Sequence, residues 1–284
     1  MSFCFIILAG GNSLRFKSDI GKPYQKIGGK SLLEININKA RQFKQIKKII
    51  LVYNKKDSKR VNALKLKNVK LILGGKTRQE STFNALKHLV NIKKIPRVLI
   101  HDAARPNFSL KLLNSILKNM KNVKAVVPKI DIQDAVKQKI DSSLSEYILG
   151  KNRDNLFLTQ TPQAFNTKEI YHLHKVNAGK YKDDDVSLYM NLNKVKFIEG
   201  EKKNFKITDQ SDFQNLKDIY RSKQSVGIGF DVHKLVPKRK LYLAGLKIDS
   251  PLGTLGHSDG DPVLHSVTDA ILGACKMGDI GQMF

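Results

Sequence analysis

A chain of 284 residues that is 41% hydrophobic is long enough for one large or two modest domains, and it is too apolar to be intrinsically disordered. Its two cysteines, Cys4 and Cys275, exclude a disulfide framework, and its apolar runs are too short for a secretory signal or a membrane span, so we expect a soluble, cytoplasmic protein without a membrane partner. The formal net charge of +26 arises entirely before residue 226, where the lysines are scattered and few stand beside aromatic residues, which argues against a nucleic-acid partner and favours anionic substrates.

Up to about residue 220, short β-rich runs alternate with amphipathic helical patterns. The predicted strands are Phe3–Leu8, Lys48–Tyr53, Val69–Leu73, Arg97–His101, Ala125–Pro128 and Lys194–Glu199. The predicted helices lie near Ser31–Phe43, Thr77–Val90 and Leu110–Met120, and the second begins with the pattern of a capping box. This alternation predicts an α/β fold with a mostly parallel, doubly wound sheet and helices on both faces. In such a sheet ligands bind at the carboxyl ends of the strands, so functional residues are expected there.

The segment after the first predicted strand has the residues of a triphosphate site. Gly10 and Gly11 lack a Cβ, so the backbone can turn sharply and approach a ligand closely, and successive N–H groups in such a turn bind anions. Arg15 adds a planar fork suited to phosphate, and Lys22 adds a compact positive charge. Taken alone, the loop fits an ordinary strand-to-helix turn with surface charges equally well.

Two later strand ends carry further polar signals. Gly75 precedes a helix whose first turn holds Arg78 and Ser81, which makes it a candidate site for a nucleobase or ribose, although an ordinary glycine turn is the simpler interpretation. The sequence HDAARP follows the fourth predicted strand, and its Asp102 suits Mg²⁺, which takes oxygen ligands and shares them with substrate phosphates. A local ion pair between Asp102 and Arg105 is the alternative, but it leaves the two alanines between them unexplained.

The order LAGG, LRF, GK, GG.TR, HDAARP, NRDNL, TQTPQAF and NFKIT resembles the 2-C-methyl-D-erythritol 4-phosphate cytidylyltransferase family over roughly residues 3–220. The resemblance implies a Rossmann-like nucleotidyltransferase domain over residues 1–222 that uses CTP, Mg²⁺ and methylerythritol phosphate, and we expect a homo-oligomer. It implies that Arg15 and Lys22 stabilise the transition state and that Arg153 and Lys206 hold the substrate phosphate. The residues implied to line the CTP site are Ala9, Gly10, Gly11, Gly75, Ser81 and Asp102.

Several positions depart from the family pattern. Gly21 precedes Lys22 where a proline is usual, and Lys76 stands where an acidic residue is common. Ala135 replaces a threonine that helps to hold substrate, and residues 183–185 are three aspartates in place of a mixed threonine and acid run. We expect these departures to change substrate affinity and not the reaction.

Composition changes after the polar segment 219–225, which predicts a domain boundary. Asp231 and His233 alternate on a predicted extended strand from Phe230, which places them on one face. His265 lies on a predicted helix, Pro262–Lys276. One oxygen and two nitrogen ligands suit zinc with an open fourth position, whereas each of these histidines taken singly would be structural.

The run GFDVH, GHSDGD, LH and GDIG resembles the start of the 2-C-methyl-D-erythritol 2,4-cyclodiphosphate synthase family. The resemblance implies that zinc on the Asp-x-His pair and the later histidine polarises a substrate phosphate. It implies that His257 and Ser258 contact substrate, with His257 stabilising the transition state, and that Asp279, Ile280 and Gly281 line the same site. Residues 226–284 are fewer than half of such an α+β domain, so we expect an incomplete fragment without synthase activity.

Two alternatives to these interpretations stay open on the sequence. The first is a cytidylyltransferase for another alditol phosphate, such as ribitol phosphate, which the substitutions at Lys76 and Ala135 would allow. The second is a basic RNA-binding protein, which predicts salt-sensitive RNA binding that CTP does not displace. It gives the glycine loop and HDAARP no role.

Overall fold

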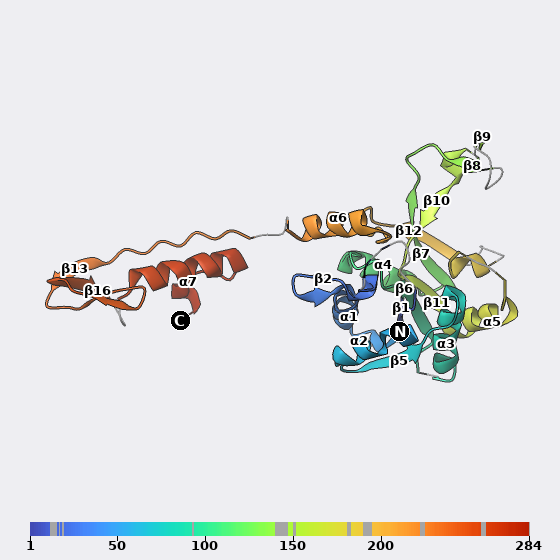
Figure 1. Cartoon of the computed structure of the whole chain (residues 1–284), viewed down its shortest axis with the longest axis horizontal. Coiled ribbons are helices and arrows are strands. Elements are labelled where there is room, and N and C mark those ends of the chain that lie inside the picture. The colour runs from blue at the N-terminus through green and yellow to red at the C-terminus, as the bar shows by residue number, and fades with distance from the viewer. Residues whose placement is uncertain are drawn as a thin grey trace. The chain divides into compact units, whose positions relative to one another are not determined.

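The structure is a computed structural model that describes residues 1–11, 16, 18, 20–92, 94–139, 147–149, 152–180, 183–189, 195–221, 225–256 and 260–283. It divides into two compact units, Met1–Lys217 and Asp218–Phe284, which are described here one at a time (Figure 1).

The first unit is built on one large sheet. Its strands are β1 (Phe3–Ala9), β4 (Ile46–Tyr53), β5 (Val69–Leu73), β6 (Arg97–Asp102), β7 (Ala125–Asp131), β10 (Phe157–Thr159), β11 (Gln163–Asn166) and β12 (Val195–Glu199). The spatial order is β10-β7-β11-β6-β1-β4-β5, and β12 pairs with β7. The pairs β1–β4, β1–β6, β4–β5 and β7–β12 are parallel, whereas β10 and β11 run antiparallel to their neighbours. The predicted mostly parallel α/β sheet is confirmed, and the antiparallel strands were not predicted.

Helices cover both faces of this sheet. They are α1 (Leu32–Arg41), α2 (Ser58–Ala63), α3 (Arg78–Leu89), α4 (Leu110–Asn119) and α5 (Thr167–Val176). The chain also forms α6 (Gln210–Arg221) after β12, and the short 3-10 turns η2 (Lys22–Tyr24), η3 (Lys55–Asp57), η4 (Arg153–Asn155) and η5 (Val186–Leu188). Alternate residues of β1 separate two cores: Phe5 and Ile7 pack with α1, α2 and α4, and Cys4 and Ile6 pack with α3 and α5. The sheet is therefore doubly wound.

Small hairpins complete the first unit. The strands β2 (Lys26–Ile27) and β3 (Lys30–Ser31) pair before α1, and β8 (Lys137–Lys139) pairs with β9 (Tyr147–Leu149). Figure 1 shows β8 and β9 standing away from the large sheet. They belong to residues 132–156, between β7 and β10, whose described part we call the arm. The N-terminus of α1 has a complete capping box, in which Ser31 and Glu34 bond to each other's backbone N–H groups.

The described residues of the second unit from 225 onward form two antiparallel strand pairs, β13–β16 and β14–β15, and two helices. Its strands are β13 (Lys234–Pro237), β14 (Leu241–Leu243), β15 (Leu246–Ile248) and β16 (Leu252–Leu255), and its helices are α7 (Pro262–Cys275) and α8 (Ile280–Met283). The helix predicted from Pro262 is confirmed, and Lys276 caps its end in the left-handed conformation. The predicted strand at residues 230–233 is wrong, because the first strand begins at Lys234. Before it, Gly227 and Gly229 pack so closely on α7 that a Cβ at either position would overlap its backbone.

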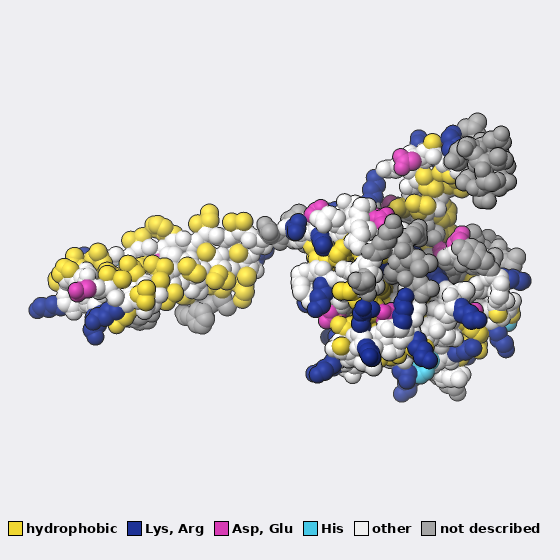
Figure 2. Space-filling view, in the orientation of Figure 1, with side chains coloured by type: hydrophobic (Ala, Val, Ile, Leu, Met, Phe, Trp, Pro, Cys, Tyr) yellow, Lys and Arg dark blue, Asp and Glu magenta, His cyan; other side chains and the backbone are white. Residues whose placement is uncertain are grey.

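The second unit exposes many apolar side chains. Val226, Ile228, Phe230 and Val232 are between 73% and 89% exposed, and Figure 2 shows apolar side chains over much of the visible face of this unit. Among the described residues 225–256 and 260–281, no apolar side chain is buried. Across the described part of the whole chain, no helix is long and apolar enough to cross a membrane.

Candidate functional site

A cleft of about 360 Å³ opens at the carboxyl edge of the large sheet, where β1, β4, β5 and β6 end. It brings together eight of the residues singled out from the sequence: Ala9, Gly10, Gly11, Lys22, Gly75, Ser81, Asp102 and Lys206. The cleft is also lined by residues that were not predicted to belong to the site, among them Leu8 and Asn54.

The first wall of the cleft is the backbone that follows β1. Asn54, at the end of β4, donates a hydrogen bond of 3.3 Å from Nδ2 to the carbonyl of Gly10 and so fixes this turn. A Cβ on Gly11 would meet no atom of the described residues within 4 Å. Arg15, the first of the two predicted cations, lies outside the described residues.

Lys22 starts the 3-10 turn η2 and lines the cleft. Its ammonium group donates to the carbonyl oxygens of Ile207 at 3.1 Å and Thr208 at 3.4 Å. The ammonium group therefore lies beside the segment that carries Lys206, although 185 residues separate Lys22 from Ile207.

The second wall is the turn between β5 and α3. Ser81 accepts a hydrogen bond of 3.0 Å from the backbone N–H of Gly75, and a Cβ on Gly75 would lie 2.4 Å from the Cβ of Glu80. The predicted capping box is half formed. Thr77 accepts from the Glu80 N–H at 3.0 Å, but the Glu80 carboxylate accepts from the N–H of Lys76, at 2.7 Å, in place of the N–H of Thr77.

Asp102 ends β6 at the floor of the cleft and contacts two cations. Its Oδ1 lies 3.1 Å from Nε of Arg78, and its Oδ2 lies 2.9 Å from Nζ of Lys206. Burial would raise the pKa of this carboxyl group, but the charges of Arg78 and Lys206 hold it well below its ordinary value. Arg105 was the partner of Asp102 in the alternative interpretation of a local ion pair, and its Nη1 donates to the carbonyl of Asn204 at 2.9 Å. The carboxylate is therefore ionised and faces the cleft.

Arg78 also lines the cleft, and the family resemblance implies no role for it. It occupies the first position of α3, where the helix dipole disfavours a positive charge. Asp102 and Asp185 compensate it, the latter at 2.8 Å from Nη1. Burial alone would lower the pKa of Arg78, but these two carboxylates raise it. The sequence carried a signal for these partners, because a positive charge in the first turn of a helix is unfavourable unless acidic side chains from elsewhere in the chain compensate it.

Lys206 is held in place by a segment bonded to the residues after β6. The Glu201 carboxylate accepts hydrogen bonds from the backbone N–H and the hydroxyl of Ser109, at the start of α4. The N–H of Ile207 donates to the carbonyl of Ala104 at 2.9 Å. These bonds fix both sides of Lys206, so its ammonium group reaches the cleft from a braced backbone.

Arg153 does not line this cleft. It begins η4, next to β10, and its Nη1 donates to the carbonyl of Gln133 at 2.7 Å. Ala135 is exposed on the same arm. The predicted role of Arg153 in holding a substrate phosphate therefore stays a prediction for this chain.

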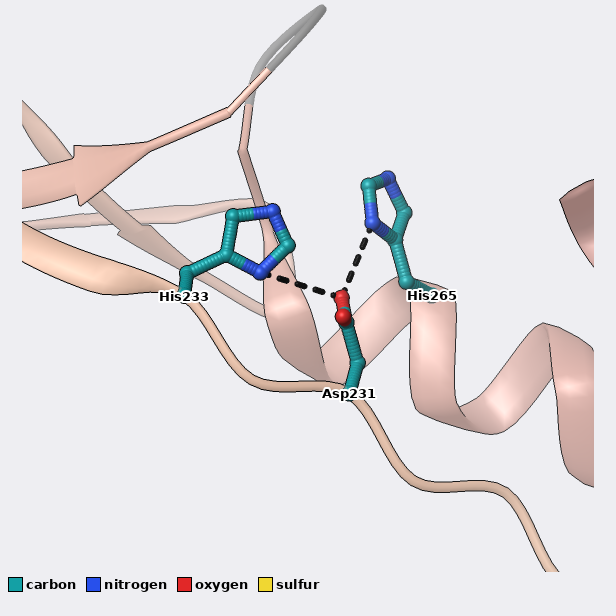
Figure 3. Close-up of side chains that lie close together, drawn as sticks. All are labelled: Asp231, His233 and His265. Atoms are coloured by element: carbon teal, nitrogen blue, oxygen red, sulfur yellow. Dashed lines mark hydrogen bonds and ion pairs between the residues drawn. The ribbon is translucent and has the colours of Figure 1, made fainter.

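The second unit brings Asp231, His233 and His265 together (Figure 3). Oδ2 of Asp231 lies 3.2 Å from Nδ1 of His233 and 3.0 Å from Nδ1 of His265, and one possible ligand atom from each residue lies within 4.8 Å of the others. Alternation along the extended segment still places Asp231 and His233 on one side, although no strand forms there. This set of one oxygen and two imidazole groups fits a zinc ion.

The other residues predicted for the second unit are only partly described. His257 and Ser258 lie outside the described residues. Asp279 precedes the short helix α8, which contains Ile280 and Gly281, and the N–H of Ile280 donates to the Asp269 carboxylate of α7 at 2.7 Å.

Comparison with known proteins gives two family matches. Residues 3–222 match the 2-C-methyl-D-erythritol 4-phosphate cytidylyltransferase family, IspD, and residues 224–284 match the YgbB family. The bifunctional enzyme IspD/IspF of Pelagibacter ubique is 52% identical over 287 residues, which cover 100% of this chain and 74% of that protein. The structure of the bifunctional IspDF of Campylobacter jejuni is similar, with a TM-score of 0.64 and 30% identity, over 100% of this chain and 73% of that one. The 4-diphosphocytidyl-2C-methyl-D-erythritol synthase of Anaerococcus prevotii has a TM-score of 0.65 and 33% identity, over 78% of this chain and 96% of that one.

Proposed function

Because this chain belongs to the 2-C-methyl-D-erythritol 4-phosphate cytidylyltransferase family through residues 3–222, we propose that the cleft at the edge of its large sheet is where CMP passes from CTP to 2-C-methyl-D-erythritol 4-phosphate. The chain is a cytidylyltransferase of isoprenoid precursor synthesis, and it carries part of a cyclodiphosphate synthase domain. The observation that carries the proposal is that one cleft is lined by the turn at Gly10 and Gly11, the turn at Gly75, and the charged residues Lys22, Asp102 and Lys206.

We assign the nucleotide to the two glycine turns. Gly11 lines the cleft and a Cβ on it would meet no described atom within 4 Å, so phosphates can lie against the backbone there, and Lys22 supplies a positive charge in the same cleft. Arg15, which follows Gly11 closely in the sequence, is assigned the same role as Lys22. The turn at Gly75 and Ser81 offers backbone groups and a hydroxyl to the base or the ribose.

We assign the phosphate of the second substrate to Lys206. Its side chain is 44% exposed, so a substrate phosphate can approach the ammonium group, whose present partner is Asp102. Arg153 is not among the residues that line this cleft in one copy, so we propose a homo-oligomer in which the arm of a second copy supplies it.

The reaction forms one bond and breaks one. A phosphate oxygen of methylerythritol phosphate attacks the α-phosphorus of CTP, and the bond from that phosphorus to the bridging oxygen breaks, so that pyrophosphate leaves with the electron pair. This transfer depends on positioning and on charge compensation more than on covalent help from the protein. Lys22 and Arg15 would offset the negative charge that develops on the phosphates.

The floor of the cleft fits a magnesium ion. Asp102 is an ionised carboxylate whose oxygens have lone pairs beyond those that Arg78 and Lys206 engage. Mg²⁺ is commonly held by one or two carboxylates together with substrate phosphates. When bound to Asp102, it would supply further compensation of phosphate charge.

For the second unit we propose a zinc site on Asp231, His233 and His265, supported by their convergence. Zinc held there would act as a Lewis acid on a substrate phosphate. We assign the substrate contacts to His257, Ser258 and residues 279–281. We place the domains at residues 1–222 and 226–284, and we propose that the second domain alone has no synthase activity, because no described apolar side chain in it is buried.

The test is pyrophosphate release from CTP, Mg²⁺ and methylerythritol phosphate by the whole chain. Lys22→Ala should lower kcat/KM by about 10²–10³-fold, by analogy with the loss of one oxyanion donor. The matched control is Lys26→Ala, which removes an exposed lysine of β2 that does not line the cleft. Equal activity of both variants would refute the assignment of the cleft. Ribitol phosphate in a parallel assay tests the substrate, and it should release no pyrophosphate.

A further inference from the structure

Two buried residues outside the cleft contact the arginine that lines it. Asp185 and His174 have side chains that are each 1% exposed, and Nε2 of His174 lies 3.0 Å from Oδ1 of Asp185. The second carboxylate oxygen of Asp185 lies 2.8 Å from Nη1 of Arg78. Burial would raise the pKa of Asp185, but Arg78 and His174 lower it below its ordinary value. Asp185 is therefore a buried carboxylate ion with two fixed partners.

The orientation of Arg78 follows from these contacts. A guanidinium group is planar, and its Nε points to Asp102 while its Nη1 points to Asp185. Two carboxylates on different nitrogens fix both the position and the plane of the group. Asp185 immediately precedes η5, so its own place depends on a different segment from that of Asp102.

His174 connects this arrangement back to the helix that carries Arg78. Its ring lies nearly parallel to the ring of Phe83, with centroids 6.4 Å apart and an interplanar angle of 9°. Phe83 belongs to α3, as does Arg78, and His174 belongs to α5. The contacts therefore form a closed ring, from α3 through Phe83, His174 and Asp185 to Arg78.

We propose that Asp185 and His174 are positioning residues for the cytidylyl transfer. They hold the Arg78 guanidinium beside Asp102, and they keep this cation from turning to the phosphates in the cleft. From the sequence, the acidic run at residues 183–185 is expected to change substrate affinity, and that expectation stays a prediction. Asp185 is buried and is not among the residues that line the cleft, so we assign it a role through Arg78. This inference rests on the proposed function, because it takes the cleft of Asp102 as the reacting site.

The proposal predicts a change in kcat. Asp185→Asn keeps the size of the side chain and removes its charge, so Arg78 loses one of its two carboxylate partners. A misplaced group in a reacting site typically costs about tenfold to a hundredfold in rate. We expect kcat to fall about tenfold, while KM for CTP changes far less, because the residues assigned to the nucleotide stay in place.

His174 gives a second test with a conservative rescue. His174→Leu removes the donor to Asp185, and His174→Gln retains an N–H donor on a side chain of similar reach. The leucine variant should lower kcat, and the glutamine variant should recover most of it. The matched control is His172→Leu, at an exposed position on the same helix, which should behave as the unaltered chain.

The experiment measures steady-state pyrophosphate release and thermal unfolding for the whole chain and these variants. Folded Asp185→Asn and His174→Leu variants with unaltered kcat would overturn the proposal. So would a His174→Gln variant as slow as His174→Leu. If Asp185→Asn does not fold, the His174 pair decides the matter. Lys22→Ala in the same assay separates the positioning role of Asp185 and His174 from the proposed function of the cleft, because full activity of that variant refutes the cleft as the site of cytidylyl transfer.

Discussion

Replacing Asp102 by asparagine tests how the cleft compensates its charges. Asparagine keeps the size of the side chain and can accept a hydrogen bond from Arg78, but it carries no charge. Lys206 then faces a neutral amide in place of a carboxylate. The substitution therefore removes the ionic part of two contacts, at 3.1 Å and 2.9 Å, and changes little else.

The size of the effect follows from burial. Breaking a fully buried ion pair costs about 3–5 kcal/mol, because a charge is left without a partner. Here the Asp102 side chain is 11% exposed, but Arg78 keeps Asp185 at 2.8 Å, and the Lys206 side chain is 44% exposed to water. The cost should therefore lie between that of a buried pair and the roughly 0.2–1 kcal/mol of an exposed pair. We expect the free energy of unfolding to fall by about 2 kcal/mol.

Urea unfolding followed by far-UV circular dichroism measures this difference. Asp131→Asn is the matched control, because the Asp131 carboxylate also lies 2.9 Å from a lysine, Lys129, but its side chain is 75% exposed. That variant should lose no more than about 0.5 kcal/mol. If both substitutions cost the same, burial does not determine the strength of the Asp102 contacts, and the reasoning above is refuted.

Three further outcomes are expected. Gly75→Ala should lower the free energy of unfolding by about 1–3 kcal/mol, because its Cβ would lie 2.4 Å from the Cβ of Glu80. At Gly11 an added Cβ would meet no described atom within 4 Å, so Gly11→Ala should leave the urea midpoint unchanged while raising KM for CTP. A loss of stability in Gly11→Ala and none in Gly75→Ala would contradict this description of the cleft. Burial raises the pKa of Asp185, but Arg78 and His174 lower it below the ordinary value of 3.8, so its ion pair contributes fully to the free energy of unfolding above that pH and is lost as the pH falls through the lowered pKa. The stability difference between the unaltered chain and Asp185→Asn should therefore shrink in acid, and a difference that does not change with pH would argue against the ion pair. His265→Ala should abolish zinc retention after dialysis, measured by atomic emission, and full retention would exclude this site.

Much of the fold could be predicted from local patterns. Runs such as Phe3–Leu8 are apolar at successive positions because both faces of the strand are buried, and the structure has a strand there. Thr77 is a helix cap in the sequence and in the structure. The antiparallel strands β10 and β11 were not predictable, because they are short and their place beside β7 and β6 depends on pairing with distant segments. The extended segment before Lys234 was predicted as a strand because alternation does not show whether a neighbouring strand exists.

The sequence by itself determined which residues follow the strands, and the parallel topology then placed Gly10, Gly75 and Asp102 at one edge. Only the tertiary structure decided how their charges are compensated. Arg78 could be seen as a cation at an unfavourable helix position, but its partner Asp185 lies far along the chain. Spacing in a sequence reports which face of an element a side chain occupies. Burial and ion pairing depend on which distant elements pack together, and no local pattern contains that information.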